Sequence, residues 1–188
     1  AIPGQGSNVP ITLLGSSGFS AQLAGMLGLP FAFAAHFAPE YLFAAAQLYR
    51  DQFRPSEVLG KPYFMVAVQV IAAETDKAAR RLFTTPQQRF LRLIRNQPVE
   101  LLPPVDSMEA LWQNDMERAA VESRLGAAIV GSNATVKAGL AKLVDETGAD
   151  EVIVVTDTYE HSDRLQSYQR VADVAATIET RSPATLRS

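Results

Sequence analysis

The turn GSSGFS, residues 15–20, contains the residue types in this sequence that are best suited to chemistry. It joins a short apolar run to a helix-like pattern and places two glycines and three hydroxyls at one point. Such a turn offers unpaired backbone N–H groups, hydroxyl donors and the positive end of a helix dipole, all of which favour an anion such as phosphate. The alternative is that Ser17 or Ser20 caps the helix and the glycines make a tight turn. The turn is not a Walker loop, because no Gly-Lys-Ser/Thr sequence follows.

His36 is the second candidate, because it follows an apolar run that we expect to be a buried strand. An imidazole at the end of a strand can donate to a ligand or transfer a proton near neutral pH, whereas the alternative is a histidine that is hydrogen-bonded beneath a loop. Gln69 lies on a later strand, where it either lines a pocket or faces the core. The chain has two histidines and no cysteine, and no ligand pair has metal spacing, so we predict no metal site.

The elements that position these candidates alternate between strand-like and helix-like patterns. Strands are expected at 9–14, 31–35, 63–73 and 151–155. Helices are expected at 19–27, 42–53, 76–83, 86–96, 107–125 and 162–178, and a further helix, capped by Ser132 or Asn133, ends near Gly148. This alternation predicts an α/β fold with a parallel sheet. Apolar residues at consecutive strand positions predict that both faces of the sheet are covered.

Composition excludes several classes of partner. The chain carries 17 basic and 20 acidic residues, and its six basic residues between 76 and 96 are interpreted as the solvated face of a helix. We therefore expect no nucleic-acid partner. No apolar run approaches the roughly 20 residues of a membrane helix, so we expect no membrane partner either. The absence of cysteine fits a reducing, cytoplasmic compartment. We expect one domain, 1–188, with a helical excursion at 76–127 after the third strand.

Three long stretches carry a family resemblance. They are VPITLLGSSGFSAQLAGMLGLPFAFAAHFAPE, KPYFMVAVQVIAAETDKAARRL and VGSNATVKAGLAKLVDETGADEVIVV. Together they resemble, in order and over nearly the whole chain, the bacterial-luciferase-like flavin-dependent monooxygenase family. The resemblance implies the carboxyl-terminal half, about units 5–8, of a TIM-type (β/α)8 barrel. A chain that begins with Ala1 in place of Met is expected to be part of a longer protein.

The same resemblance implies a cofactor and an activity. Reduced flavin mononucleotide (FMN) would bind with its phosphate at Gly15, Ser16, Ser17 and Ser20, and His36 would be the catalytic candidate. The intact protein would be a homo-oligomeric oxidoreductase that uses dioxygen on a small-molecule organic substrate, with a flavin reductase as a partner. Because the first half of the barrel supplies other contacts, the resemblance leaves open whether this fragment is active if it stands alone. The alternative is a non-catalytic flavin- or phosphate-binding half-barrel module that self-associates.

Overall fold

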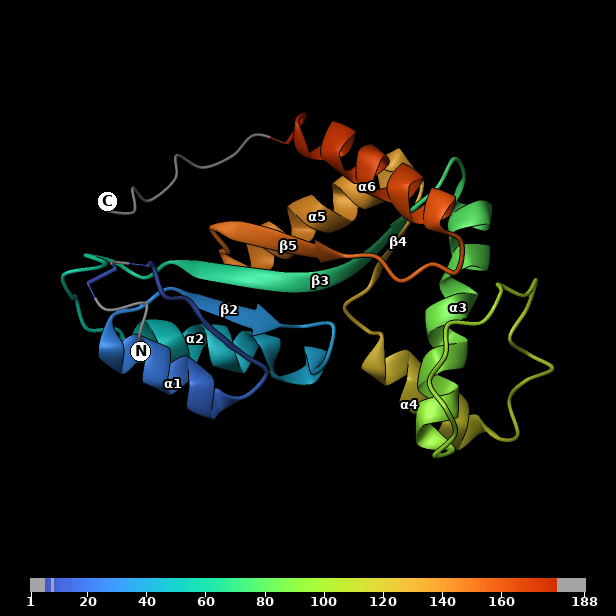
Figure 1. Cartoon of the computed structure of the whole chain (residues 1–188), viewed down its shortest axis with the longest axis horizontal. Helices are drawn as coiled ribbons and strands as arrows, with labels where there is room; N and C mark the ends of the chain where they lie inside the picture. Colours follow the sequence, from blue (N-terminus) through green and yellow to red (C-terminus); the bar gives the residue numbers. More distant parts are fainter. Residues whose placement is uncertain (1–5, 8, 179–188) are drawn as a thin grey trace.

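The computed structural model describes residues 6–7 and 9–178, and their strands and helices alternate as predicted (Figure 1). In chain order the elements are β1 (Leu13–Gly15), α1 (Gly18–Leu27), β2 (Phe31–Ala34), η1 (Pro39–Tyr41), α2 (Leu42–Gln52), β3 (Phe64–Ala72), α3 (Asp76–Ile94), α4 (Asp115–Arg124), β4 (Ile129–Gly131), α5 (Asn133–Thr147), β5 (Glu151–Val155) and α6 (His161–Ala175). β1 pairs with β2, and β3 pairs with β2, β4 and β5, in every case in parallel. The predicted α/β fold with a parallel sheet is confirmed.

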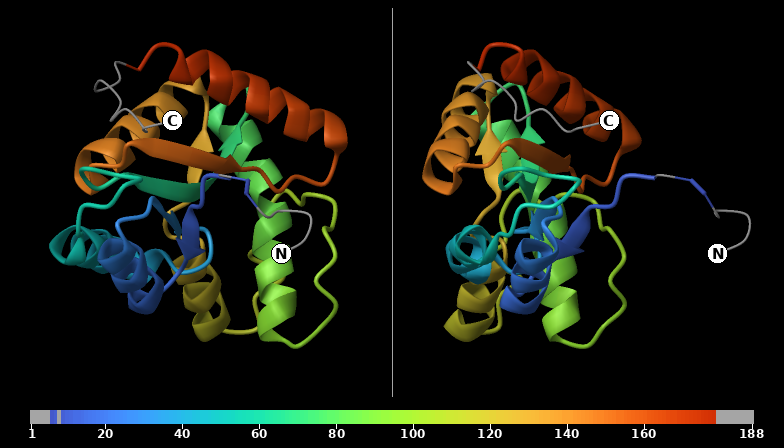
Figure 2. Two further views of the ribbon diagram at one scale, coloured as in Figure 1. Left: turned by 60° about the vertical axis from the view of Figure 1, so that its left-hand side comes forward. Right: turned by 90° about the vertical axis from the view of Figure 1, so that its left-hand side faces the viewer.

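Four helices pack against the central strand β3, and in Figures 1 and 2 α1 and α2 lie below it and α6 lies above it. Even-numbered residues of β3 pack with α1 and α2 or with α5 and α6: Phe64, Val66, Val68 and Val70. Successive strand residues point to opposite faces, so these residues share one face. The other face carries Gln69, Leu14 and Ile153, of which Leu14 is 66% and Ile153 is 37% exposed. The prediction that both faces are covered is confirmed for β2 and for nearly all of β3, whose consecutive residues are buried, and is wrong for β1 and β5 in the part of the chain described.

Tyr49 is the polar centre of the main core. Its ring is fully buried and lies against the rings of Phe31 and Phe64. Its hydroxyl accepts a hydrogen bond from the Tyr63 N–H at 3.0 Å and donates to the Leu29 carbonyl at 2.9 Å. The phenol thereby satisfies one backbone group just before β2 and one just before β3.

Arg50, the next residue, fixes α2 to the end of α5. Its Nη2 donates to the carbonyl oxygens of Thr147 and Gly148, and its guanidinium lies 5.2 Å from the centre of the Phe64 ring. A cation at these carbonyls complements the negative end of the α5 dipole. One side chain thus joins two helices and the central strand.

The excursion after β3 differs from the prediction at Pro86. The sequence predicts separate helices at 76–83 and 86–96, but α3 runs from Asp76 to Ile94 with Pro86 inside it. An internal proline removes a hydrogen bond and costs about 3 kcal/mol or more. Side chains around it compensate: Thr85 donates to the Leu102 carbonyl at 2.8 Å, and Gln88 donates to the Pro103 carbonyl at 2.9 Å. These contacts with the returning segment keep α3 in one piece.

Asp76 caps α5 from another helix. Ser132 occupies the cap position of α5, as predicted, but its side chain makes no capping hydrogen bond. The Asp76 carboxylate instead accepts from the Ser132 N–H at 2.7 Å and from the Thr135 hydroxyl at 2.8 Å. The sequence also did not predict β4, the three-residue strand that leads into this junction.

The helices α3 and α4 enclose a small core of their own. Its buried members are Leu91, Met108, Val121 and Leu125. Trp112, the single tryptophan of the chain, packs against them. Arg95 binds Glu117 through two hydrogen bonds, Nε to Oε1 at 2.9 Å and Nη2 to Oε2 at 2.7 Å. Arg95, with help from the Gln113 N–H, lowers the pKa of Glu117 to about 2.

Acid is expected to loosen this small core. The pKa of Glu117 is lowered from 4.5 to about 2, so the stability that the pair contributes is complete above pH 4.5 and is lost as the pH falls toward 2. Urea unfolding followed by Trp112 fluorescence should show that Glu117→Gln is less stable than the wild type at pH 7. The difference between the two proteins should shrink between pH 4.5 and pH 2. A difference that stays constant over this range would contradict the assignment.

Two kinds of feature are absent from the described residues. None of the helices there combines the length and the hydrophobicity needed to cross a bilayer. In the same residues, no three His, Asp or Glu side chains gather closely enough to hold a metal ion.

Candidate functional site

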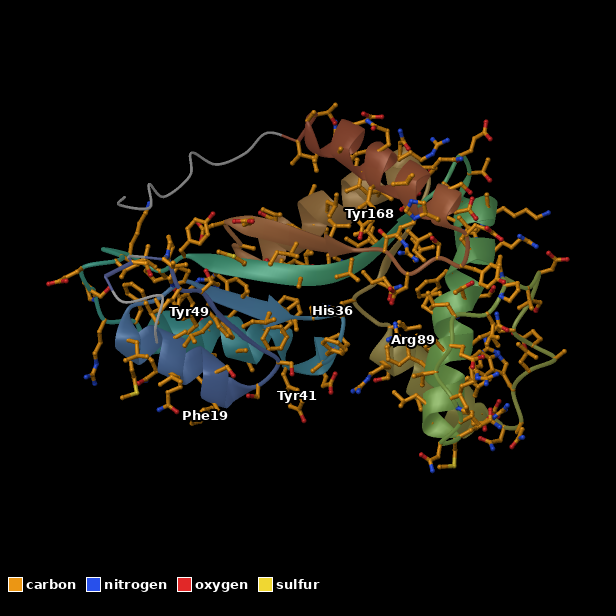
Figure 3. The ribbon with its side chains drawn as sticks, viewed as in Figure 1. Phe19, His36, Tyr41, Tyr49, Arg89 and Tyr168 are labelled. Carbon is orange, nitrogen blue, oxygen red and sulfur yellow. The ribbon has the colours of Figure 1, made fainter. Side chains whose placement is uncertain are left out.

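A cavity of about 300 Å³ lies at the carboxyl edge of the sheet, beside α3. Residues that line it come from the ends of β2, β3 and β5 and from α3: His36, Phe37, Gln69, Val155, Asp157 and Arg89. Figure 3 labels His36 beyond the end of β2 and Arg89 on α3. The carboxyl edge is where parallel α/β sheets bind their ligands, so this cavity is the candidate site.

His36 lines the cavity and is held by the neighbouring strand. Its backbone N–H donates to the Ala67 carbonyl at 3.2 Å, and its Nδ1 lies 3.3 Å from the same oxygen. A carbonyl only accepts, so Nδ1 carries the proton in this contact and a neutral ring leaves Nε2 as an acceptor. The ring also packs on Phe37, with 4.3 Å between centroids. The Nε2 atom of His36 has no hydrogen-bond partner among the residues that the structure describes, so it is available to a ligand.

The Gly15–Ser20 turn lies at the same edge but does not line this cavity. Gly15 ends β1, in register with Phe33 of β2. A side chain at Gly15 would overlap the Cβ and Oγ atoms of Ser20, so the close approach requires glycine. Ser17 occupies the cap position of α1, but its side chain makes no capping hydrogen bond. In the described part of the chain, the hydroxyls of Ser16, Ser17 and Ser20 have no hydrogen-bond partner.

An ion pair forms part of the cavity wall. Arg89 Nη1 lies 3.0 Å from Asp157 Oδ2, which joins α3 to the segment after β5. Sequence reasoning missed both residues, because it assigned the basic residues of 76–96 to a solvated face. The available signal was the position of Asp157, two residues beyond the last strand and hence at the carboxyl edge.

Gln69 faces the cavity, which settles the choice that the sequence left open. The residue is 3% exposed and pairs in register with Val155, another cavity residue. Its Nε2 is buried without a hydrogen-bond partner among the residues described. Buried polar groups are nearly always paired, so this amide requires an explanation.

Comparison with known proteins identifies relatives of the chain. The Bacillus subtilis (strain 168) protein YvbT is 53% identical over 174 residues, which are 93% of this chain and 52% of YvbT. A luciferase-like monooxygenase of Escherichia coli (strain K12) is 46% identical over 173 residues, which are 92% of this chain and 51% of that protein. The chain thus spans about half the length of the curated relatives it matches.

Solved structures and a family model agree with these relatives. The crystal structure of apo-MsnO8 is 30% identical, with a TM-score of 0.76 over 99% of this chain and 54% of that one. The oxygenating constituent of 3,6-diketocamphane monooxygenase of Pseudomonas putida, in complex with FMN, shares the fold at 18% identity, with a TM-score of 0.57 over 91% of this chain and 49% of that one. The model of the luciferase-like monooxygenase family matches residues 1–173. The chain therefore belongs to the luciferase-like monooxygenase family.

Proposed function

We propose that the chain is the carboxyl-terminal half, about units 5–8, of a TIM-type (β/α)8 barrel. The packing of four helices on one face of β3 supports this, because barrel strands carry helices outside and fill the inside with strand side chains. Apolar residues at and before the β1 edge also lie exposed: Val9 at 71%, Ile11 at 60% and Leu14 at 66%. A preceding set of β/α units would cover them. The half-length match to the relatives agrees with this arrangement.

The function proposed for the complete barrel is oxidation of a small organic substrate by dioxygen and reduced FMN. Family membership supports the reaction class, and the diketocamphane enzyme is a fold neighbour in complex with FMN. The observation that carries the cofactor is the Gly15–Ser20 turn. At Gly15 any side chain would overlap Ser20, so this position requires glycine. The turn also has serine hydroxyls without a hydrogen-bond partner among the described residues, and it leads into the start of a ten-residue helix. These groups suit a phosphate.

Each group of this chain has a part in that function. The first N–H groups of α1 and the hydroxyls of Ser16, Ser17 and Ser20 would bind the phosphate. Reduced flavin, when bound, supplies the electrons that activate dioxygen. The Nε2 of His36 would accept a hydrogen bond or a proton from a ligand in the cavity. The helices α3 and α4 would exclude water from that side.

Flavin titration tests the phosphate site. FMN binding, followed by quenching of its fluorescence, should weaken roughly tenfold or more in Ser16→Ala/Ser17→Ala, because two hydrogen bonds to a charged group are lost. Riboflavin lacks the phosphate and should bind the variant and the wild type equally. Gly60→Ala is the control, since open space surrounds that position. Equal FMN affinity in the double variant and the wild type would refute the site.

A second candidate is a non-catalytic flavin- or phosphate-binding half-barrel that self-associates. The exposed apolar side chains near β1 and at Phe19, which is 74% exposed, favour association. A chain that sediments as a dimer, binds FMN and consumes no dioxygen with reduced FMN beyond the free-flavin rate would support this candidate. Three further expectations stay predictions: that the complete protein forms a homo-oligomer, that a flavin reductase is its partner, and that it is cytoplasmic.

A further inference from the structure

The amide of Gln69 is the least satisfied buried group beside the cavity. The residue is 3% exposed and lines the cavity, and its side-chain Nε2 is buried without a hydrogen-bond partner among the described residues. Thr156 provides the contrast: it is equally buried, and its hydroxyl donates to the Val70 carbonyl at 2.8 Å. A buried amide without a partner costs free energy in the ligand-free protein, and a ligand that pairs with it removes that cost.

We propose that the Gln69 amide binds the imide edge of the flavin ring. An amide presents a donor and an acceptor side by side, and the C(=O)–NH–C(=O) edge of the ring presents the complementary pair. The pairing works whichever way the amide group is rotated. The inference rests on the proposed function, because the ring belongs to the FMN whose phosphate is assigned to the Gly15–Ser20 turn.

The surroundings of Gln69 suit an uncharged ring. Phe37, Phe90 and Val155 supply apolar walls to a cavity of about 300 Å³. Arg89 and Asp157 neutralise each other at 3.0 Å, which leaves Arg124 as the one lining cation without an ion-pair partner among the described residues. Ligand cavities of this kind combine mostly apolar walls with a few polar groups that fix orientation.

The separation between the two subsites matches the cofactor. Gly15 is in register with Phe33, and Phe33 with Val66, so β1 and β3 are two strand spacings apart, about 10 Å. Gln69 lies three residues beyond Val66 toward the carboxyl edge, another ~10 Å along the strand. The diagonal of about 14 Å is a span that the phosphate, the five-carbon ribityl chain and part of the ring can bridge.

The test uses Gln69→Leu with FMN, lumiflavin and 3-methyllumiflavin as probes. Lumiflavin has the ring without the ribityl phosphate, and 3-methyllumiflavin has a blocked imide N–H. Loss of the two hydrogen bonds should weaken FMN and lumiflavin binding about tenfold in the variant. The wild type should bind 3-methyllumiflavin about as weakly as the variant binds lumiflavin, with no further loss in the variant. Unchanged lumiflavin affinity in Gln69→Leu would overturn the proposal.

Stability without ligand gives a second readout. Gln69→Leu removes an unpaired amide, so the Tm of the ligand-free protein should stay the same or rise. Thr156→Val, the matched control, removes a satisfied hydroxyl and should lower the Tm by roughly 2–4 °C. A Tm for Gln69→Leu that falls as far as that of Thr156→Val would show that the amide has a structural role, and this too would overturn the proposal.

The phosphate-site variant separates this inference from the proposed function. Ser16→Ala/Ser17→Ala should weaken FMN but not lumiflavin, whereas Gln69→Leu should weaken both. If the serine variant alone has an effect, the phosphate site stands and the Gln69 assignment fails. If Gln69→Leu alone has an effect, the ring site stands and the phosphate site fails. If the wild type binds neither flavin, both fail.

Discussion

Replacing Gly28 with alanine should lower the free energy of unfolding by about 2–4 kcal/mol. Gly28 ends α1 with φ at 62°, the left-handed region in which a side chain is strained. A Cβ there would overlap the Arg54 carbonyl oxygen and lie 2.6 Å from the Ser56 Cβ. Both neighbours are tied to the end of α1, since the Arg54 N–H donates to the Gly25 carbonyl and the Ser56 hydroxyl to the Gly28 carbonyl. They have little freedom to move away.

Alanine substitutions at two other glycines serve as controls for Gly28→Ala, with the free energy of unfolding measured by urea denaturation. Gly148 has nearly the same φ, 60°, but an added Cβ would meet only the Arg50 guanidinium, at 3.2 Å. Gly148→Ala should therefore cost about 1 kcal/mol from backbone strain. Gly60→Ala has open space and should stay within about 0.5 kcal/mol of the wild type. Equal losses at Gly28 and Gly148 would show that the overlap with the 54–56 segment has no energetic effect.

Removing the Tyr49 hydroxyl should cost about 1–3 kcal/mol. In Tyr49→Phe the ring keeps its place between Phe31 and Phe64. The Tyr63 N–H loses its hydrogen-bond acceptor, and the Leu29 carbonyl loses the hydrogen bond that the hydroxyl donated to it. Chemical unfolding at pH 7 measures the effect. Tyr41→Phe is the control, because that side chain is 55% exposed. A Tyr49→Phe protein as stable as Tyr41→Phe would mean that the buried backbone groups find other partners.

Alkaline pH provides an independent check on Tyr49. Burial, as the largest cause, raises its pKa from 10.0 to about 12. Stability linked to this group is therefore complete below pH 10 and is lost as the pH rises toward 12, when the unfolded chain releases the phenol proton first. The wild type should lose this part of its stability over that range, and Tyr49→Phe should not. The gap between the two proteins should narrow accordingly.

Sequence patterns predicted those parts of the fold that depend on neighbouring residues. Apolar runs predicted where the strands lie. The start of α3 at Asp76 was also predicted, because Thr75 caps the helix by accepting a hydrogen bond from the Ala78 N–H. Features set by distant residues were missed. Pro86 looked like a helix end, because the hydrogen bonds that support it come from residues 102–103. The Asp76 cap of α5 spans 56 residues and leaves no local signal.

The candidate site divides in the same way. The turn at Gly15 and the position of His36 followed from residue type and strand ends, which are local properties. The orientation of Gln69 could not be predicted, because the apolar residues around it on β3 are buried on both sides and show no alternation. The Arg89–Asp157 pair joins residues 68 apart in the chain, so only the folded structure shows it.

The nine residues of β3 serve both main cores, the first half packing with α1 and α2 and the second half with α5 and α6. Opening either cluster would expose one half of β3 while the other half stays packed in the second cluster. We therefore expect the sheet and its four helices to unfold as one cooperative unit. The α3–α4 core has its own apolar cluster, so we expect it to open separately from the sheet and to give a ligand a route to the cavity.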